Sequence, residues 1–316
     1  MTKIKVIGVG GSGSNAVSRM ASHKIQGVEL IAVNTDLQDL KKAKADLKIQ
    51  IGKDITKGLG SGMNPEIGKK AAQEQKEELS EAIKGADMVF ITCGLGGGTG
   101  SGAAPVISEI AKTLGILTIV LTTTPFSFEG APRQKIAQKA LEEIRSKVDT
   151  LVVIPNDKIL SLADQNTTLL SAFWIADDIL RQAVQGISDL ILVPGIVNVD
   201  FADVKSIMAD SGQALFGQGK GRGEKRIEQA VNQAINSPLA NFSIQGAKGV
   251  LFNIFGGDDL TLAEIDQAAK IITKNIDPQA KVIFGAVKDK KLKKGEIRIM
   301  IVATGFQMLD KFLYKR

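Results

Sequence analysis

The first half of the chain alternates short apolar runs with longer segments in which apolar residues recur at helical spacing. The apolar runs, which predict strands, lie at residues 3–9, 29–33, 87–92, 116–122 and 150–154. The helical segments lie at residues 15–21, 65–84, 104–114 and 133–148. Strands that alternate with helices are typical of a parallel sheet with helices on both faces, so we expect an α/β, doubly wound fold.

The pattern changes in the second half. Residues 168–190 have apolar side chains at helical spacing, interrupted only by Gly186, and predict one long helix. A smaller α+β pattern follows, with strands at 249–254, 281–287 and 296–304 and a helix at 262–274. Thr261 and Glu264 have the spacing of a capping box at the start of that last helix.

These patterns divide the chain into four predicted parts. The doubly wound domain occupies residues 1–166, a central helix 167–193, a C-terminal α+β domain 194–306 and a short tail 307–316. The sequence contains no low-complexity linker, so we expect the long helix to join the two domains.

Composition excludes several classes of protein. The net charge is +6, but much of the excess lies in residues 41–44 and 288–294, and aromatic residues make up only 4%, so we expect no nucleic-acid partner. His23 is the only histidine, which argues against histidine triads and histidine-rich metal sites. The single cysteine, Cys93, excludes an intrachain disulfide and fits a reducing compartment. Without a signal peptide or an apolar run of membrane-spanning length, we expect a cytoplasmic protein that does not insert into membranes.

A glycine-rich turn follows the first predicted strand. Gly8 to Gly13 fit the pattern G-x-G-x-x-G, in which glycines let backbone amides approach a phosphate at the start of a helix. One such match is ambiguous, because a tight turn without a ligand has the same sequence. Asp36 ends the second strand and could bind a ribose, so an NAD-dependent oxidoreductase stays open at this point.

A second glycine-rich turn, Gly94 to Gly102, follows another buried strand and precedes another helix. Two phosphate cradles at the ends of parallel strands suit a triphosphate better than a single dinucleotide. The pattern G-x-x-x-x-G-K-[ST] is missing from the sequence, so this is not a P-loop.

The sequence of this second turn, GGGTGSG, resembles the signature of the tubulin/FtsZ GTPase superfamily. The stretch GVGGSGSNAV resembles the first phosphate loop of the FtsZ proteins, the bacterial division branch of that superfamily. AVNTD, PFSFEGAPR, IPNDKIL and NVDFADV follow in the family's order, so the resemblance extends from residue 4 to about residue 306. It implies a GTP-binding domain joined by the central helix to a C-terminal GTPase-activating domain.

The resemblance implies a set of nucleotide-binding residues. Those that hold the phosphates are Gly10, Gly11, Ser12, Asn15, Gly96, Gly97, Gly98, Thr99 and Gly100. Glu129 and Arg133 would contact ribose and phosphate, and a guanidinium is a strong phosphate partner in its own right. Asn34 and Asn156, at strand ends, would border the ribose or the base.

Phe173 and Asp177 lie one helical turn apart and therefore share a face of the long helix. Phe173 can stack on a purine. Asp177 can accept hydrogen bonds from the N1 and N2 groups of guanine, and adenine has no matching pair of donors, so we expect GTP rather than ATP. Taken without the resemblance, the same residues would be a core phenylalanine and a solvated aspartate.

The resemblance also implies a catalytic loop that contains Asn198, Asp200 and Asp203. Close carboxylates can orient and polarise a water for attack on the γ-phosphate. The alternative is that Asp200 or Asp203 only caps a helix that runs through Met208.

Helix length indicates where this loop acts. At about 1.5 Å per residue the helix over residues 168–190 spans about 35 Å, and the acidic loop follows the end opposite Phe173 and Asp177. We therefore expect the loop to reach the nucleotide of a neighbouring subunit, in a head-to-tail contact that builds a filament. The resemblance implies the same, with GTP between subunits and hydrolysis activated by assembly.

The resemblance extends to cofactors, partners and location. It implies GTP and GDP as ligands, magnesium bound mainly through the phosphates, potassium as a further candidate cation, and a role in the division ring at midcell. Residues 307–316 faintly resemble the family's peptide for membrane-tethering partners, joined directly to the core; a trimmed chain is the alternative.

Three residues depart from the family pattern: Thr124 stands where Arg or Lys is common, Ser14 where Asn is frequent, and Trp174 where a small residue is usual. Thr124 and Trp174 keep open a second function, a nucleotide-dependent filament protein with weak hydrolysis.

Overall fold

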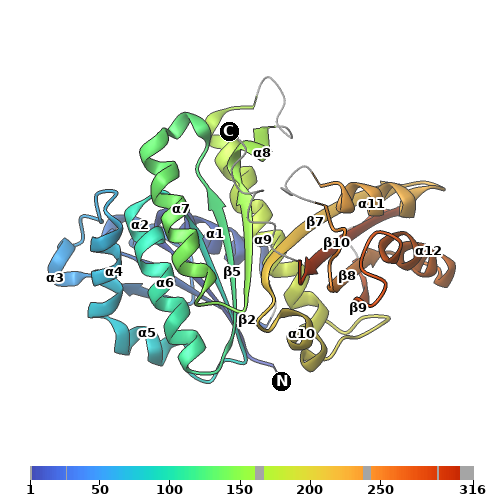
Figure 1. Cartoon of the computed structure of the whole chain (residues 1–316), viewed down its shortest axis with the longest axis horizontal. Coiled ribbons are helices and arrows are strands. Elements are labelled where there is room, and N and C mark those ends of the chain that lie inside the picture. The colour runs from blue at the N-terminus through green and yellow to red at the C-terminus, as the bar shows by residue number, and fades with distance from the viewer. Residues whose placement is uncertain (1, 26, 161–166, 238–242, 290–291, 307–316) are drawn as a thin grey trace. The chain divides into compact units, whose positions relative to one another are not determined.

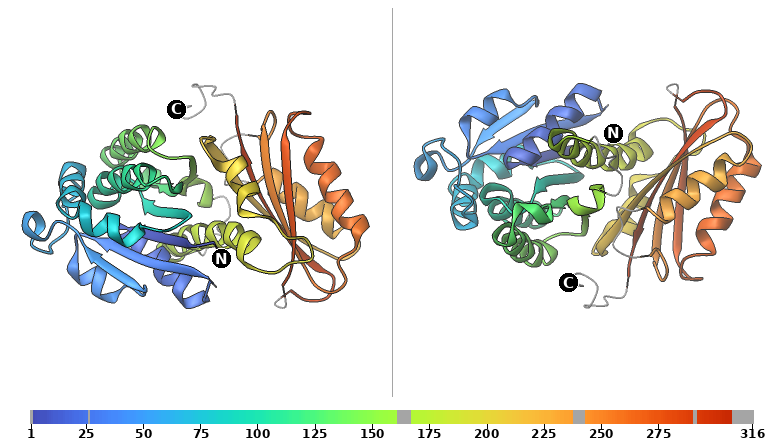
Figure 2. Two further views of the ribbon diagram at one scale, coloured as in Figure 1. Left: turned by 90° about the horizontal axis from the view of Figure 1, so that it is seen from below. Right: turned by 90° about the horizontal axis from the view of Figure 1, so that it is seen from above.

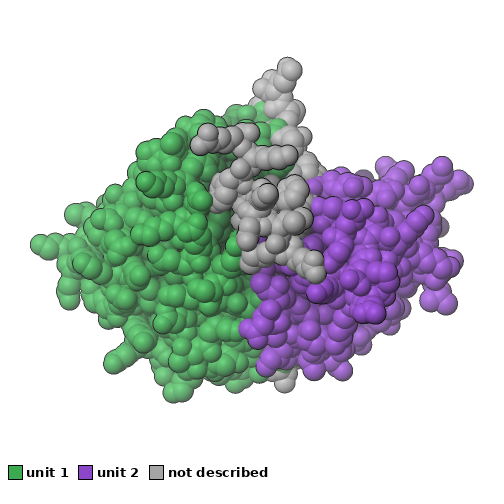
Figure 3. Space-filling model, viewed as in Figure 1, with its two compact units in different colours: residues 1–185 green, residues 186–316 purple. Residues whose placement is uncertain are grey.

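The computed structural model describes residues 2–25, 27–160, 167–237, 243–289 and 292–306. The chain divides into two compact units, residues 1–185 and 186–316, which Figure 3 shows in different colours. The boundary falls inside one continuous helix, α9 (Leu169–Leu192), so the predicted long helix is confirmed and Gly186 does not break it.

The first unit is built on six parallel strands (Figure 1). The strands are β1 (Ile4–Val9), β2 (Val28–Asn34), β3 (Leu47–Gln50), β4 (Met88–Gly94), β5 (Leu117–Thr124) and β6 (Thr150–Pro155). Their order in the sheet is β3-β2-β1-β4-β5-β6, so the strand order reverses between β1 and β4. This confirms the doubly wound α/β fold, in which ligands bind at the carboxyl ends of the strands beside such a reversal.

Helices cover both faces of this sheet (Figure 2). The helices are α1 (Gly10–His23), α2 (Leu37–Lys42), α3 (Lys53–Thr56), α4 (Pro65–Glu74), α5 (Lys76–Ile83), α6 (Gly98–Thr113), α7 (Ala131–Arg145), α8 (Asn156–Leu160) and the first half of α9. Helices α4 to α7 pack with the odd-numbered residues of β1 and β4 into one apolar core. Helix α1 packs on the opposite face and contacts α9 through a hydrogen bond from Arg19 to Asp177.

The prediction of a single helix over residues 65–84 is wrong. Gln75 leaves the helical conformation (φ −103°, ψ 29°) and separates α4 from α5. Its side-chain oxygen accepts a hydrogen bond from the backbone nitrogen of Gly52, a contact that the helical pattern could not indicate. Two other helices begin earlier than predicted, at Gly10 and Gly98, because the glycine loops themselves form the first helical turns.

The second unit is an α+β fold, as predicted. Its strands are β7 (Gly212–Arg222), β8 (Gly249–Gly256), β9 (Lys281–Lys288) and β10 (Glu296–Thr304), in the order β7-β10-β8-β9. Its helices, after the second half of α9, are α10 (Phe201–Met208), α11 (Arg226–Ile235) and α12 (Leu262–Thr273). The predicted capping box at α12 is confirmed, since Thr261 N donates to Glu264 Oε2 (2.9 Å) and Glu264 N donates to Thr261 Oγ1 (3.3 Å).

Sequence patterns missed β7. Its glycines at 217, 219 and 221 replace the expected apolar side chains because the strand lies directly against the backbone of α11. A Cβ atom added at Gly219 would lie 1.9 Å from the carbonyl oxygen of Ala230. At these glycines the strand packs against α11 through its backbone, so the sequence shows no alternation of apolar side chains there. Among the described residues, no helix is long and apolar enough to cross a membrane.

Candidate functional site

Both glycine loops lie at the carboxyl edge of the first sheet, because β1 and β4 are adjacent and parallel. Close backbone packing holds the loops in place. A Cβ atom added at Gly13 would lie 2.5 Å from Thr92 O, and one added at Gly100 would lie 2.5 Å from Gly94 O. Gly10 has a positive φ of 73° and approaches Gly100 N. Only glycine fits at these positions, so the sequence pattern encodes the loop geometry.

Other glycines in the same loops have open space in front of them. Nothing lies within 4 Å of a Cβ atom added at Gly97, and at Gly11 only Asp39 Oδ2 comes close, at 3.6 Å. Helices α1 and α6 begin here without a side-chain cap and without an acidic residue in the first turn. Uncapped amides and two positive helix dipole ends therefore face the same open space, which is the environment that a phosphate chain requires.

The loops open into a cavity of about 510 Å³. Thirteen of the fifteen predicted nucleotide-binding residues line it: Gly10, Gly11, Ser12, Asn34, Gly97, Gly98, Thr99, Gly100, Glu129, Arg133, Asn156, Phe173 and Asp177. The volume lies within the range usual for small-molecule and cofactor sites.

Two buried side-chain amide atoms at this cavity have no hydrogen-bond partner among the described residues. They are Asn34 Nδ2 and Asn156 Oδ1, on side chains that are 2% and 5% exposed. A buried polar atom left without a hydrogen bond is costly, so each position requires an additional group. One amide offers a donor and the other an acceptor, which fits a ribose or a base with both kinds of group.

Glu129 and Arg133 contribute opposite charges to the cavity, and Arg133 Nη1 lies 3.6 Å from Glu129 Oε2. Glu129 Oε1 also accepts a hydrogen bond from Phe126 N (2.9 Å), which holds the carboxylate at the turn before α7. The Arg133 side chain is 37% exposed and keeps donors free for an anion.

Phe173 and Asp177 share the cavity-facing side of α9. Phe173 is 38% exposed, with its ring edge-on to Phe126 at 5.3 Å, so one face of the ring is available for stacking. Asp177 is buried, and burial raises its pKa to about 6, opposed by a hydrogen bond from Arg19 Nε to Oδ2 (3.2 Å). An aspartate in this position can accept two parallel hydrogen bonds from a ligand once it is ionised.

Two predicted residues do not line the cavity. Asn15 is exposed on α1. Gly96 lies behind the second loop with a φ of 97°, and its backbone nitrogen donates to Ser101 Oγ (3.0 Å). Gly96 therefore shapes the loop, and Asn15 is not among the cavity-lining residues.

Sequence reasoning missed one wall of the cavity, Leu59 to Met63. Ser61 Oγ and Thr35 Oγ1 both form hydrogen bonds with Thr99 Oγ1 (2.9 and 2.7 Å), which ties this wall to the second glycine loop. The glycines at 58, 60 and 62 all have positive φ, so their alternation was the available signal.

Asp36 lies at the cavity edge but caps α2. Its Oδ1 atom accepts hydrogen bonds from Gln38 N (2.8 Å) and Asp39 N (3.1 Å). The feature that had favoured a dinucleotide is thus explained by local helix capping.

The acidic loop belongs to the second unit. Its backbone is fixed by a bridge between Val197 and Ala286 and by the burial of Val199, which leaves Asn198, Asp200 and Asp203 exposed. Asp200 occupies the N-cap position of α10, yet its side chain forms no cap hydrogen bond. Side-chain capping does not account for this carboxylate.

The loop's third polar residue has a structural role. Asn198 Oδ1 accepts a hydrogen bond from Gly195 N (2.7 Å), which stabilises the turn after α9. Within the described ranges, no group of three or more His, Cys, Asp or Glu side chains is placed to hold a metal ion.

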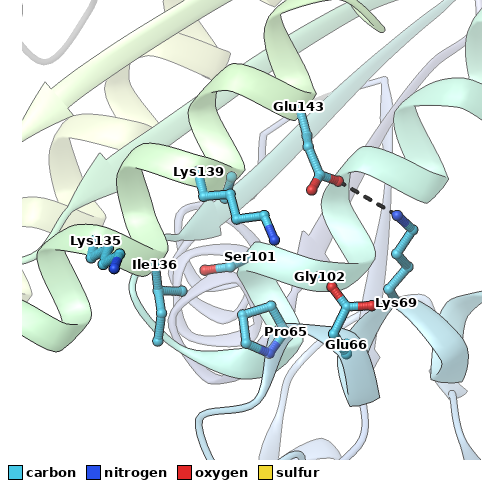
Figure 4. A pocket seen from close by; sticks show the side chains of 10 residues that line it. Pro65, Glu66, Lys69, Ser101, Gly102, Lys135, Ile136, Lys139 and Glu143 are labelled. Carbon is cyan, nitrogen blue, oxygen red and sulfur yellow. Dashed lines mark ion pairs between the residues drawn. The ribbon is translucent and has the colours of Figure 1, made fainter.

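A second cavity, of about 250 Å³, lies between α4, α6 and α7 (Figure 4). Lys69 and Glu143 face each other across it at 3.8 Å. Ser101 forms part of its floor, but its hydroxyl already accepts from Gly96 N. None of the described buried polar atoms without a partner lines this cavity, so we assign it no ligand.

Comparisons with known proteins agree with this geometry. Residues 3–164 match the model of the Tubulin/FtsZ family, GTPase domain, and residues 212–307 match that of the FtsZ family, C-terminal domain. An empty FtsZ dimer from M. jannaschii is 47% identical, with 96% of this chain and 88% of that chain covered and a TM-score of 0.92.

More distant structures share the fold. CetZ2 from Haloferax volcanii, as a protofilament with GTPγS bound, is 22% identical, with 97% of this chain and 94% of that chain covered and a TM-score of 0.81. CetZ1 from the same organism, a monomer with GDP bound, is 24% identical, with coverages of 97% and 95% and a TM-score of 0.82.

Proposed function

This chain belongs to the tubulin/FtsZ family and has that family's GTPase domain, and we propose that it hydrolyses GTP on assembling head to tail into filaments. The observation that carries the proposal is the single cavity into which both uncapped helix N-termini and both glycine loops open. Phosphates would bind to the backbone amides of these loops, with Arg133 as an additional cationic partner.

The base would lie against Phe173 and Asp177. An ionised Asp177 could accept from both N1–H and the 2-amino group of guanine, whereas adenine has an acceptor at N1 and would place it against carboxylate oxygens. Two acceptors that face each other lose the hydrogen bonds that guanine would form, so this one side chain supports selection of GTP over ATP.

Hydrolysis would need the acidic loop of a second copy. Asp200 and Asp203 are exposed, and Asp200 forms no side-chain cap hydrogen bond, which supports a role for these carboxylates in orienting a water at the site of a second copy. Within one chain, α9 continues for 15 residues from Asp177 to its end at Leu192 before this loop begins, a length of about 22 Å at about 1.5 Å per residue. The M. jannaschii relative described as a dimer and the CetZ2 protofilament support self-association of this fold.

The remaining parts of the proposal concern ions, partners and location. Magnesium would be held mainly by phosphate oxygens and water, as is usual for this ion, with potassium as a second candidate. We further propose that the filaments form the cytoplasmic division ring at midcell. Residues 307–316, proposed to bind a membrane-tethering protein, lie outside the described residues.

GTP turnover per molecule, measured against protein concentration with a pelleting assay in parallel, tests the mechanism. We expect near-zero turnover in dilute protein and a steep rise above a threshold. Asp200→Ala should retain GTP binding and lose at least about 100-fold in turnover, a typical loss for a group that positions the nucleophile. Asp266→Ala, which removes an exposed carboxylate on α12 instead, is the matched control and should behave as wild type.

Turnover per molecule that does not change with concentration would overturn the shared site. Filaments that pellet with GTP but barely hydrolyse it would instead identify a nucleotide-dependent filament protein with weak hydrolysis.

A further inference from the structure

Arg19, on α1, contacts two residues of α9 at once. Its Nε atom donates to Asp177 Oδ2 at 3.2 Å, and its guanidinium carbon lies 4.8 Å from the centre of the Trp174 ring. Trp174 and Asp177 are three residues apart on one helix, so they lie on neighbouring turns of the same side. The guanidinium is therefore held between an aromatic face and a carboxylate.

We propose that Trp174 and Arg19 are positioning residues that hold the Asp177 carboxylate oriented for the guanine base. Neither residue lines the nucleotide cavity, whereas Asp177 does. The inference rests on the proposed GTP-binding function and adds a specificity device to it: the tryptophan orients the arginine, and the arginine orients the aspartate.

The geometry of the carboxylate permits both contacts. Arg19 occupies one lone pair of Oδ2, and an ionised carboxylate can accept about four hydrogen bonds through its two oxygens. About three acceptor positions therefore remain, which is enough for the N1–H and 2-amino groups of guanine. A rotation of the carboxylate away from Arg19 would lose the alignment of both.

Burial makes this support necessary. Asp177 is only 6% exposed, and desolvation raises its pKa, while the hydrogen bond and the charge of Arg19 oppose that rise. Asp178, the next residue, raises it further through like-charge repulsion. If Arg19 moved away, the carboxyl group would be protonated more easily, and a protonated carboxyl cannot accept two donors side by side.

Trp174 provides an aromatic face for the Arg19 guanidinium, which a small side chain would not. An arginine on an aromatic face is held by a cation–π attraction as well as by packing. Trp174 is 47% exposed, so the site should tolerate replacement without a large loss of stability. The usual small residue of the family at this position would leave the guanidinium without a stacking partner.

The test measures the affinities of GDP and of inosine diphosphate, which lacks the 2-amino group. Nucleoside diphosphates keep hydrolysis out of the measurement. In wild type, GDP should bind more tightly. Trp174→Leu, which removes the aromatic face, should reduce that preference by about 5- to 10-fold. Trp174→Phe, which keeps an aromatic face, should retain it within about twofold. Leu169→Ala, at an exposed position on a different side of the same helix from Trp174, should not change it.

A spectroscopic measurement checks the contact itself. Trp174 is the only tryptophan of the chain, so intrinsic tryptophan emission reports on this position alone. Arg19→Met should change that emission in the absence of nucleotide and should reduce the GDP preference as Trp174→Leu does.

The possible outcomes separate the positioning role of Trp174 and Arg19 from the proposed binding of guanine by Asp177. An equal loss of affinity for both nucleotides in Trp174→Leu, or an unchanged preference, overturns the positioning role while the proposed function stands. A wild-type protein without any preference for GDP overturns the assignment of guanine to Asp177 and this inference with it.

Discussion

Around the nucleotide cavity of the first unit, backbone packs on backbone: a Cβ atom added at Gly13 would lie 2.5 Å from Thr92 O. Around the acidic loop of the second unit, by contrast, Val199 is buried while Asp200 and Asp203 are exposed. The main chain fixes the shape of the first site. The second exposes its carboxylates on a backbone that neighbouring segments hold in place. This contrast is what we expect when one surface binds a ligand and the other completes the site of a second copy.

The largest effect should come from the buried charges of the second unit, which contains no part of the cavity. Arg226 donates to Glu264 and Asp259, with shortest contacts of 2.6 Å, and its side chain is 6% exposed. Arg226→Ala would leave carboxylates partly buried and unpaired, so the free energy of unfolding should fall by about 3–5 kcal/mol. GDP affinity, measured well below the melting temperature, should stay within about twofold because the sites are independent.

This prediction has a matched control and a pH signature. Arg222→Ala removes an exposed arginine near Glu296 and should change stability by less than about 0.5 kcal/mol. Hydrogen bonds from Arg226 lower the pKa values of Asp259 and Glu264. Their stabilisation is therefore present above the unfolded-state pKa values, near 4, and is lost as the pH falls through the lower folded values. A difference between Arg226→Ala and wild type that persists undiminished at pH 2–3 would contradict this account.

Substitutions in the two glycine loops should separate effects on stability from effects on nucleotide binding. Gly13→Ala places a methyl group against Thr92 O and the carbonyl carbon of Gly8, so we expect a loss of about 1–3 kcal/mol in thermal or denaturant unfolding. Gly97→Ala enters open space at an ordinary φ of −97° and should leave stability within about 0.5 kcal/mol.

Gly97→Ala, which should leave stability unchanged, should weaken nucleotide binding. Its methyl group would occupy the space that a phosphate needs, and GDP affinity should fall at least about tenfold, the equivalent of one lost strong hydrogen bond. If Gly97→Ala bound GDP as wild type does, the phosphates could not lie against this loop.

The smallest expected effect is a pH dependence of nucleotide binding. Burial raises the pKa of Asp177 from 3.8 to about 6, and only the ionised form accepts two hydrogen bonds from guanine. GDP affinity should be constant above about pH 7 and fall up to about tenfold per pH unit below the pKa. Asp177→Asn should bind GDP weakly and lose this dependence.

The same group has the opposite effect on the stability of the free protein. Its folded pKa lies above its unfolded value, so the folded state binds a proton that the unfolded state releases between pH 4 and 6. The Asp177 contribution to stability should therefore increase as the pH falls from about 6 to about 4. For nucleotide binding, a GDP affinity that stays the same between pH 7 and pH 5 would contradict the proposed contact between Asp177 and guanine.

Much of the fold followed from local pattern. The long helix, the capping box at Thr261 and all the strands except β3 and β7 were predicted correctly apart from their ends, because they depend on neighbours two to four residues away. The break at Gln75 and the strand β7 were not, because they depend on Gly52 and on the backbone of α11. Patterns of apolar residues do not report contacts that backbone atoms make with distant segments.

By itself, the sequence determined that two glycine loops follow two buried strands, and its motifs indicated the family and a triphosphate as ligand. The tertiary structure decided that β1 and β4 are neighbours, so that both loops share one cavity. It also showed that Gly13 is packed while Gly97 faces open space, and that Arg19 reaches Asp177 across 158 residues of sequence. The physical reason is that a glycine in the sequence permits a close backbone approach but does not specify which segment approaches it. Likewise, a charged residue is paired with an opposite charge from a distant segment only after the sheet has assembled.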